Sequence, residues 1–394
     1  MKIRSLLTAG IAILLLSSLK GQTVNSGNTK KEKKYEVAVY YFPNYHLDKR
    51  NEKYFGKGWT EWKLVKEATP RFQGHQQPKV PLWGYTDEAN PKQMAQKIKA
   101  AASHGIDAFI FDWYYYDDGP FLERGLEEGF MKAANNKLLK FGIMWANHDY
   151  NDIFPYTVGK EPKLLYPGKI TPQTWDKMTD YIIEKYFKNS AYWLIDGAPY
   201  FSIYDLSKFI EIFGTLEGAA KGLEDFREKT KAAGFKDLNI NAVGEDPATL
   251  LKKLGFNSFT SYVWGGGSHF PTTSYDSVKN NYFKYAEKAT AQFSIPYYPN
   301  VSMGWDASPR TNQATKFDDS GYPYMPIITG NTPEAFKKAL IQAKEFMDVH
   351  LKKNKILTIN SWNEWTEGSY LEPDTVHKMG YLNAIKEVFG NHRK

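Results

Sequence analysis

Residues 356–368 read ILTINSWNEWTEG, and this stretch carries the strongest information in the chain on both fold and site. It opens with a run of apolar and β-branched residues, Ile356 to Trp362, of the kind that forms a strand buried on both faces of a parallel sheet. Two acids, Glu364 and Glu367, follow at once, interleaved with tryptophans and closed by a glycine. A buried strand that ends in acids and rings is typical of a parallel β/α protein with its site at the carboxyl ends of the strands.

Seven more runs of the same kind precede this one. They are Val37 to Phe42, Ile106 to Trp113, Phe141 to Ala146, Pro199 to Tyr204, Leu238 to Val243, Ser258 to Val263 and Tyr297 to Ser302. Helical patterns separate them at Pro91 to His104, Phe121 to Asn135, Pro172 to Phe187, Lys208 to Ala233, Pro247 to Leu254, Tyr275 to Phe293 and Thr332 to Lys353. This alternation predicts an α/β fold, a single (β/α)8 TIM barrel with long βα loops over residues 35–394. A doubly wound open sheet is the alternative, but no glycine-rich phosphate loop follows the first run.

The first 34 residues differ from the rest in composition. Residues 1–21 begin with Lys2 and Arg4 and continue into an apolar run from Leu6 to Leu19, which predicts a secretory signal peptide cleaved near Gly21. The apolar run is short for a membrane span, although an uncleaved anchor stays open. Residues 22–34 are polar and are expected to form a flexible tail. We therefore expect an exported protein, periplasmic, secreted or on the cell surface, without a stable membrane span after cleavage.

Composition excludes several classes of protein. The 394 residues include no cysteine, so disulfides and thiolate metal sites are ruled out. The formal charge of +7 falls to +4 once the three cations of the signal are removed, which is too mild a charge for a nucleic-acid footprint. The 11 Trp, 27 Tyr and 24 Phe are more rings than a core of this size requires, so some should face a ligand. We expect a monomer without a cofactor or metal.

Aromatic, amide and acidic residues gather where the predicted strands end. A pyranose ring has apolar C–H faces and a rim of hydroxyls, so this mixture suits an oligo- or polysaccharide substrate. The candidate substrate-binding residues are Tyr41, His46, Trp59, Glu61, Trp62, Asp112, Trp113, Trp145, Asn147, His148, Trp264, Trp305, Asp306, Arg310, Trp362 and Asn363. Tyr40, Tyr41, Tyr262 and Tyr298 also fit core positions, and Asp112, Asn147 and His148 fit structural caps or satisfied polar groups equally well.

Glu364 and Glu367 are the candidate catalytic carboxylates. Hydrolysis of a glycosidic bond uses two carboxyl groups, one of which donates a proton to the leaving oxygen. Burial between Trp362 and Trp365 would raise the pKa of one glutamate toward the range of a working acid. The spacing alone is weak evidence, because most pairs of this kind lie on solvated helix surfaces. The preceding strand and the neighbouring tryptophans favour catalysis.

Three chemical alternatives stay open. Glu245, at the end of the fifth predicted strand, could form a conventional pair with Glu364. Arg310 could bind an acidic sugar or hold Asp306. A metal site is a further alternative, disfavoured because the histidines near carboxylates lack i, i+4 spacing: His46, His75 and His148.

Several motifs in order resemble a known family. They are Tyr40-Tyr41-Phe42-Pro43-Asn44-Tyr45-His46, Gly58-Trp59-Thr60-Glu61-Trp62, Gly74-His75-Gln76-Gln77-Pro78, Gly105-Ile106-Asp107-Ala108-Phe109, Trp145-Ala146-Asn147 and Trp362-Asn363-Glu364-Trp365-Thr366-Glu367-Gly368. The chain resembles the WbsX-type proteins, which are similar to glycoside hydrolase family 99, the endo-α-mannosidases and endo-α-mannanases. The resemblance spans nearly all residues after the tail.

The resemblance implies a retaining hydrolase of α-linked glycans without an enzyme nucleophile. In family 99 the 2-hydroxyl of the sugar attacks the anomeric carbon, and water opens the resulting 1,2-anhydro sugar. Carried over by position, Glu364 would be the base at the 2-hydroxyl and Glu367 the acid, then base, at the glycosidic oxygen. Outside the motif that contains the two glutamates the match is closer to the WbsX group, which leaves mannose specificity and endo action open. The other readings are a non-catalytic carbohydrate-binding barrel and a glycosyltransferase of polysaccharide assembly.

Overall fold

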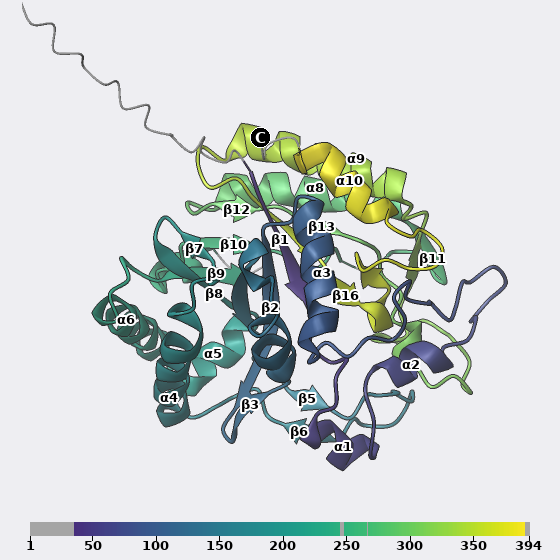
Figure 1. Ribbon diagram of the computed structural model, residues 1–394, viewed down its shortest axis with the longest axis horizontal. Coiled ribbons are helices and arrows are strands. Elements are labelled where there is room, and N and C mark those ends of the chain that lie inside the picture. The colour runs from purple at the N-terminus through teal and green to yellow at the C-terminus, as the bar shows by residue number, and fades with distance from the viewer. Residues whose placement is uncertain (1–34, 245–247, 266, 391–394) are drawn as a thin grey trace, which may run out of the picture. The chain divides into compact units, whose positions relative to one another are not determined.

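The computed structural model describes residues 35–244, 248–265 and 267–390, and these form a parallel β-barrel surrounded by helices (Figure 1). The predicted signal, the predicted tail and Glu245 lie outside the described residues. The barrel strands are β1 (Glu36–Tyr41), β2 (Ala108–Tyr116), β4 (Lys140–Trp145), β8 (Ala198–Ile203), β9 (Asn239–Val243), β10 (Ser258–Thr260), β12 (Tyr297–Tyr298), β13 (Asn300–Ser302) and β15 (Ile356–Asn360). All neighbours pair in parallel, which confirms the predicted (β/α)8 barrel.

The seventh strand closes the ring in two pieces, because Pro299 interrupts it. Proline has no N–H to give to the ladder, so strand pairing stops at that residue. Before it, Tyr298 pairs with Thr260 of β10, and after it, Asn300 pairs with Thr358 of β15. The Pro299 carbonyl still accepts a hydrogen bond from the Thr358 N–H at 3.0 Å. β12 and β13 therefore act as one strand that joins the two ends of the sheet.

Helices cover the outside of the barrel (Figure 1). They are α3 (Pro91–Ser103), α4 (Pro172–Ile182) with its π-helical continuation Ile183–Phe187, α5 (Leu206–Phe213), α6 (Leu216–Ala232), α7 (Ala248–Lys253), α8 (Tyr275–Gln292), α9 (Pro333–His350) and α10 (Gly380–Phe389). α9 shows why these segments are helical. Thr332 caps its first turn through the Ala335 N–H, Pro333 occupies the first helical position, and one apolar face from Phe336 to Met347 is buried.

Two predicted helices need correction, and one of the helices that cover the barrel was not predicted. The helix expected over residues 121–135 is instead a π-helical segment, Gly125–Phe130, followed by a short 3-10 turn, Asn136–Leu138. Gly129 lies so close to Glu88 that a Cβ there would be 2.0 Å from the Glu88 carbonyl oxygen, so tertiary contact sets this segment. The long helix expected over residues 208–233 is two helices, because Gly214 ends α5 with a φ of 73° and Thr215 caps α6. α10 was not predicted.

The long βα loops contain short elements of their own. After β1 come α1 (Lys49–Phe55) and α2 (Trp62–Glu67), which the sequence prediction lacked. In the later βα loops, β3 (Gly119–Phe121) pairs with β2, β5 (Tyr150–Asn151) with β6 (Leu164–Tyr166), β11 (Thr272–Ser274) with β14 (Ile327–Thr329), and β16 (Asn363–Glu364) with β17 (Ser369–Tyr370). β7 (Leu194–Ile195) instead precedes β8 and pairs with its first residues, at the opposite end of the barrel. The 3-10 turns Ser308–Arg310 and Trp365–Glu367 follow β13 and β16. These loops build the rim at the carboxyl ends of the strands.

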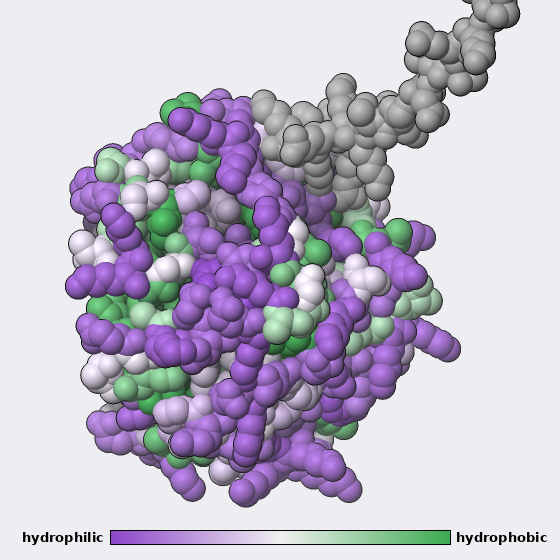
Figure 2. Space-filling model, turned by 90° about the vertical axis from the view of Figure 1, so that its left-hand side faces the viewer, coloured by the Kyte–Doolittle hydropathy of each residue, from purple (hydrophilic) through white to green (hydrophobic). Residues whose placement is uncertain are grey.

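The surface of the barrel is mainly hydrophilic on the face in Figure 2, where hydrophobic residues are scattered between polar ones. Scattered apolar residues are normal on a folded domain. Within the described part of the chain, no helix is both long and apolar enough to cross a bilayer.

Candidate active site

A hollow of about 530 Å³ lies at the carboxyl ends of the barrel strands, within the size range of small-ligand sites. Nearly every part of the rim contributes a side chain to it. The polar and aromatic members include Asp112, Tyr114, His148, Tyr204, Tyr262, Trp305, Arg310, Tyr322, Glu364 and Glu367. Both predicted catalytic carboxylates therefore face one hollow in the place expected for a TIM barrel.

The turn after β15 directs the two glutamates into the hollow. Glu364 ends β16, which pairs antiparallel with β17, and its N–H donates to Ser361 Oγ at 2.9 Å. Glu367 ends the following 3-10 turn, and its carbonyl accepts from the Asp306 N–H at 2.6 Å. Gly368 is required at this point, because its φ is 64° and a Cβ would lie 2.6 Å from Asp306 Cβ. The glycine that closes the motif thus lets the strand-seven loop pack on the turn.

Arg310 connects the acids of the site. Its Nε and Nη2 approach Glu61 Oε1 at 2.8 and 2.7 Å, and Nη2 also lies 3.3 Å from Glu364 Oε2. Its Nη1 contacts Glu367 Oε1 and donates to the Tyr322 hydroxyl at 2.6 Å. Tyr322 in turn donates to Glu367 at 3.0 Å. One buried guanidinium is therefore shared by three carboxylates, two of which are the predicted catalytic pair.

The electrostatic environment favours the protonated forms of the pair. Burial, the proximity of Glu367 and that of Glu61 raise the pKa of Glu364 well above its usual range, against the opposing effect of Arg310. Burial also raises the pKa of Glu367, although Arg310 and the Tyr322 hydrogen bond hold that rise down. Two acids this strongly coupled titrate as a pair. Burial thus favours the protonated form of each carboxyl, while Arg310 favours the ionised form of both.

A third acid reaches the pair through a tyrosine. Tyr262 Oη lies 2.7 Å from Asp112 Oδ2 and 3.3 Å from Glu364 Oε1. Burial raises the pKa of Asp112 well above its usual range, while the Tyr262 hydrogen bond opposes that shift. The hydroxyl has one proton, so it donates to one of the two carboxyls at a time, and the shorter distance favours Asp112. Tyr262 therefore links Asp112 to Glu364.

A buried layer beneath the pair holds the turn in place. Asn363 bridges to β1, since its amide accepts from the Phe42 N–H at 2.9 Å and donates to the Phe42 carbonyl at 2.7 Å. Lys97 of α3 and Glu372 form an ion pair at 3.0 Å with almost no exposed surface. Glu372 also accepts from Trp365 Nε1 at 3.0 Å. The turn that carries Glu364 and Glu367 is thus tied to both β1 and α3.

Of the predicted substrate-binding residues, four line the hollow: Asp112, His148, Trp305 and Arg310. Burial lowers the pKa of His148, which favours its neutral ring. Arg310 does not hold Asp306, the structural alternative, because its partners are Glu61, Glu364 and Glu367.

Five predicted aromatic contacts need correction, because the rings lie in the core, away from the hollow: Tyr41, Trp113, Trp145, Trp264 and Trp362. Each is at most 2% exposed. Trp113 donates to Tyr186 Oη at 2.9 Å, and Trp264 donates to the Asn300 carbonyl at 3.0 Å while it stacks on Tyr282. Successive strand residues point to opposite faces, so half of the rings near a strand end point outward beneath the helices. The sequence does not reveal which half.

Other predicted residues support the site without lining it. Trp59 packs against Phe55, and Trp62 donates to the Thr86 carbonyl at 2.8 Å. His46 lies 2.9 Å from Glu88 in a fully buried pair.

Asn147 and Asp306 are structural in the same way. The Asn147 amide exchanges two hydrogen bonds with the backbone of Asp205, at 2.6 and 2.7 Å, and so fixes the start of α5. Asp306 is bound by His75 and Gln77 at 2.9 and 2.7 Å. His46, His75 and His148 each have a different partner, and no group of three metal-binding side chains occurs among residues 35–244, 248–265 and 267–390.

Six tyrosines line the hollow, and none of them was among the predicted substrate-binding residues: Tyr114, Tyr150, Tyr156, Tyr204, Tyr262 and Tyr322. Tyr262 was expected in the core but lies between Asp112 and Glu364. Tyr204 follows β8 directly, and its position at a strand end was a usable signal. Tyr322 sits in the long loop after β13, where no periodicity or strand boundary marks it.

Comparison with known proteins identifies relatives of the whole barrel. The family model described as Glycosyltransferase WbsX matches residues 37–385. The uncharacterised protein WxcX of Xanthomonas campestris pv. campestris is 24% identical over 366 residues, which cover 89% of this chain and 49% of WxcX. The chain therefore spans about half the length of the curated relatives that it matches.

Two solved structures share the fold. The GH99 endo-alpha-mannosidase of Bacteroides thetaiotaomicron superimposes with a TM-score of 0.54 at 16% identity, over 91% of this chain and 97% of the enzyme. A protein titled glycoside hydrolase-like superimposes with a TM-score of 0.59 at 15% identity, over 91% of this chain and 94% of the other. At these identities the likeness concerns the fold alone.

Proposed function

Since the chain belongs to the WbsX family, whose barrel it shares from residue 37 to 385, we propose that it is an exported glycoside hydrolase that cleaves α-linked glycans. One observation carries the proposal. Glu364 and Glu367 face the same hollow, contact the same Arg310 guanidinium, and both have raised pKa values. A buried pair of carboxyls that shares a proton is what acid and base attack on a glycosidic bond requires.

The proposed reaction retains the anomeric configuration. It starts from the form of the pair in which Glu367 holds the proton. Glu364 takes the proton of the 2-hydroxyl, O2 bonds to C1, the bond from C1 to the glycosidic oxygen breaks, and Glu367 protonates that oxygen. Water then gives a proton to Glu367 and attacks C1, the C1–O2 bond opens, and Glu364 returns its proton to O2. Two inversions at C1 give net retention.

The neighbouring groups have defined tasks in this scheme. Arg310 contacts both carboxyls, so it holds them in fixed positions and limits how far their pKa values rise. Tyr262 hydrogen bonds to Asp112 and contacts Glu364, so it can orient the base. Trp305, Tyr204 and Tyr114 line the hollow and supply ring faces on which a pyranose can pack. None of these tasks requires a cofactor.

The charge balance favours hydrolysis over glycosyl transfer from a nucleotide sugar. Five acids stand in or beside the hollow with Arg310, whose nitrogens already contact three of them: Glu61, Asp112, Asp149, Glu364 and Glu367. Donor phosphates would meet net negative charge there, which opposes their binding in a site of low dielectric. A neutral glycan meets no such barrier.

The test is product release from a panel of α-mannans, rhamnose-containing glycans and acidic polysaccharides. The full chain is compared with Glu364→Gln and Glu367→Gln, and with Glu128→Gln, a half-exposed acid paired with Arg124, as the control. We expect one substrate class to be cleaved by the wild type and the control, and both site variants to lose at least about 1,000-fold in rate.

Two results would contradict the proposal. Cleavage that survives in either site variant would move the chemistry to other residues, with Glu245 the first to examine. Glycan binding without any product, or product formation only from an activated sugar donor, would instead favour the carbohydrate-binding or glycosyltransferase reading.

A further inference from the structure

A second hollow, of about 320 Å³, lies beside the first and has no part in the reaction scheme. Trp305 lines both hollows. The wall between them is thin: Asp306 and Gly368 line the second hollow, while their chain neighbours Trp305 and Glu367 line the first. A glycan held at the catalytic pair could therefore extend into this space.

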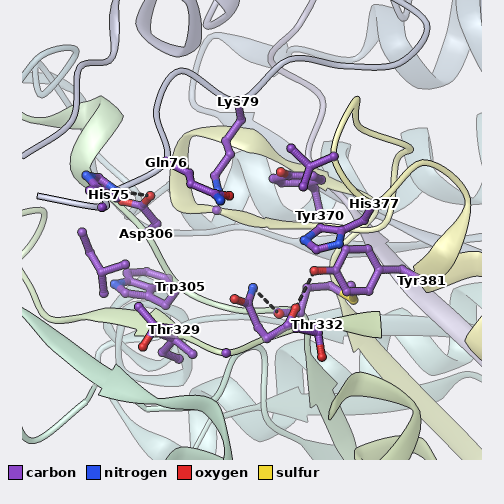
Figure 3. A pocket seen from close by; sticks show the side chains of 18 of the residues that line it. His75, Gln76, Lys79, Trp305, Asp306, Thr329, Thr332, Tyr370, His377 and Tyr381 are labelled. Carbon is purple, nitrogen blue, oxygen red and sulfur yellow. Dashed lines mark hydrogen bonds and ion pairs between the residues drawn. The ribbon is translucent and has the colours of Figure 1, made fainter. Parts of the chain in front are cut away.

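Aromatic residues form the sides of the second hollow (Figure 3). Trp305 stands on one side, and Tyr370 and Tyr381 on the opposite side, with His377 beside them. The rings of His377 and Tyr381 meet edge to face with centroids 5.1 Å apart. The Tyr370 hydroxyl donates to Asp374 and the Tyr381 hydroxyl donates to the Asn331 carbonyl. Both tyrosines are only 6% exposed, and one face of Tyr370 is covered by Trp365, so Trp305 offers the more accessible ring. Such walls suit the C–H face of a sugar.

The Asp306 carboxylate in the wall of this hollow accepts hydrogen bonds at both of its oxygens. Asp306 Oδ1 accepts from Ser308 Oγ at 2.6 Å, and Oδ2 is bound by His75 at 2.9 Å and Gln77 at 2.7 Å. The Arg71 N–H donates to His75 Nδ1 at 3.0 Å, which places the His75 proton on Nε2, facing Asp306. Burial would raise the pKa of Asp306, but the His75 and Ser308 hydrogen bonds and the nearby charge of Lys79 lower it overall, although Lys79 forms no ion pair with this carboxylate.

Lys79 is a cation of a different kind. It lines the second hollow, where Figure 3 shows its side chain extending inward beside Gln76, and it makes no ion pair with any residue in the described ranges. Arg310 in the first hollow contacts three carboxylates and has no nitrogen left for an acidic sugar. Across the two hollows the cation open to an anionic ligand is therefore Lys79.

From this arrangement we propose that the second hollow binds a uronic acid unit of the glycan, with its carboxylate on Lys79 and its ring against Trp305. This inference rests on the proposed function in one respect, that the first hollow holds the cleaved sugar of the same chain. It names the substrate class as acidic, with the charged unit adjacent to the cleavage site. Lys79 is a specificity residue in this account and takes no part in bond breaking.

The test measures affinity, so that it does not depend on turnover. The probes are acidic oligosaccharides from a glucuronomannan and the same oligosaccharides after chemical reduction of the carboxyl to a primary alcohol. Calorimetry with the full chain should give about five- to tenfold tighter binding of the acidic form, falling as ionic strength rises. Lys79→Met should abolish that preference and Lys79→Arg should keep most of it. The control is Lys352→Met, which removes an exposed lysine at the opposite end of the barrel.

The outcomes separate the two proposals. Equal affinity of the wild type for both forms, or an acidic preference that persists in Lys79→Met, overturns the inference, whatever the cleavage assays give. Acid-selective binding that depends on Lys79 supports it, even if no glycan is cleaved and the hydrolase proposal fails. Loss of the preference in Lys352→Met as well would assign it to net charge and would also overturn the inference.

Discussion

Arg310 directs two of its nitrogens, Nε at 2.8 Å and Nη2 at 2.7 Å, to the same oxygen of Glu61. Glu61 lies in the loop after β1 and Arg310 in the loop after β13, 249 residues apart in sequence. This contact joins the two loops and sets the guanidinium so that its outer nitrogens reach Glu364 and Glu367. The geometry of the catalytic pair therefore depends on a residue that does not line the hollow.

Glu61→Gln should shift the pH dependence of activity downward. The Glu61 charge raises the pKa values of Glu364 and Glu367, so its removal lowers both. The alkaline limb of the kcat profile, where the acid loses its proton, should then move to lower pH, and kcat at its optimum should fall about tenfold as Arg310 loses its anchor. A limb that stays in place or moves upward would contradict this role for Glu61.

Arg310→Gln should shift the pH dependence of activity upward, in the direction opposite to Glu61→Gln. Arg310 lowers the pKa values of both Glu364 and Glu367, so without it both pKa values rise and the limbs of the profile move to higher pH. We expect kcat to fall at least about 100-fold, because the pair also loses its fixed geometry. Arg124→Lys, in an exposed pair with Glu128, is the matched control and should leave the profile unchanged. Shifts of equal sign in the Glu61 and Arg310 variants would defeat the electrostatic account.

Glu364→Gln should stabilise the fold at neutral pH although it removes activity. The folded state raises the pKa of Glu364 above its ordinary value of 4.5, so the folded protein binds more protons than the unfolded chain above that pH. The unfolding free energy of the wild type then falls as pH rises, and the variant lacks this loss. Denaturant unfolding should show no difference near pH 4 and a gain of about 1–3 kcal/mol at pH 7.5. A variant less stable than the wild type at pH 7.5 would refute this prediction.

Lys97→Met should destabilise the protein through Glu372. The two side chains are 0% and 1% exposed and 3.0 Å apart, so the variant leaves a buried carboxylate without its cation. Removal of one partner of a buried pair costs about 3–5 kcal/mol, whereas removal of both is much less costly. Chemical unfolding should therefore show a large loss in Lys97→Met and partial recovery in the double variant with Glu372→Gln. A double variant as unstable as the sum of both single variants would show that the ion pair is not the cause.

The strands of this barrel could be predicted because each is a short, continuous apolar run. Ile356 to Asn360 and Val37 to Tyr41 lie within such runs, and the acids that follow the last run mark the site. Elements set by tertiary contact were not predictable. The π-helical segment at Gly125–Phe130 forms where Gly129 meets Glu88, and no local pattern encodes that contact.

The site was predictable in part for the same reason. Glu364 and Glu367 follow β15, and Asp112 lies in the middle of β2, so their positions could be inferred from the apolar runs. The tryptophans could not be sorted into core and site: Tyr262 and Trp264 both lie in the loop after β10, yet Trp264 packs on Tyr282 while Tyr262 faces the hollow, and loop conformation is not encoded in a periodic pattern. The partners of Arg310 come from loops far apart in sequence, so its role as the shared cation is visible only in the folded barrel.

The most direct test of the proposed mechanism compares two forms of one cleaved glycan, which differ only in a methyl group on O2 of the sugar at the scissile bond. Turnover is followed by release of the reducing end, and affinity is measured separately with Glu367→Gln. If Glu364 activates the 2-hydroxyl as the nucleophile, the methylated glycan should bind within about tenfold of the free form and give no product. Product from the methylated glycan at a comparable rate would contradict the account and assign the attack on C1 to another group.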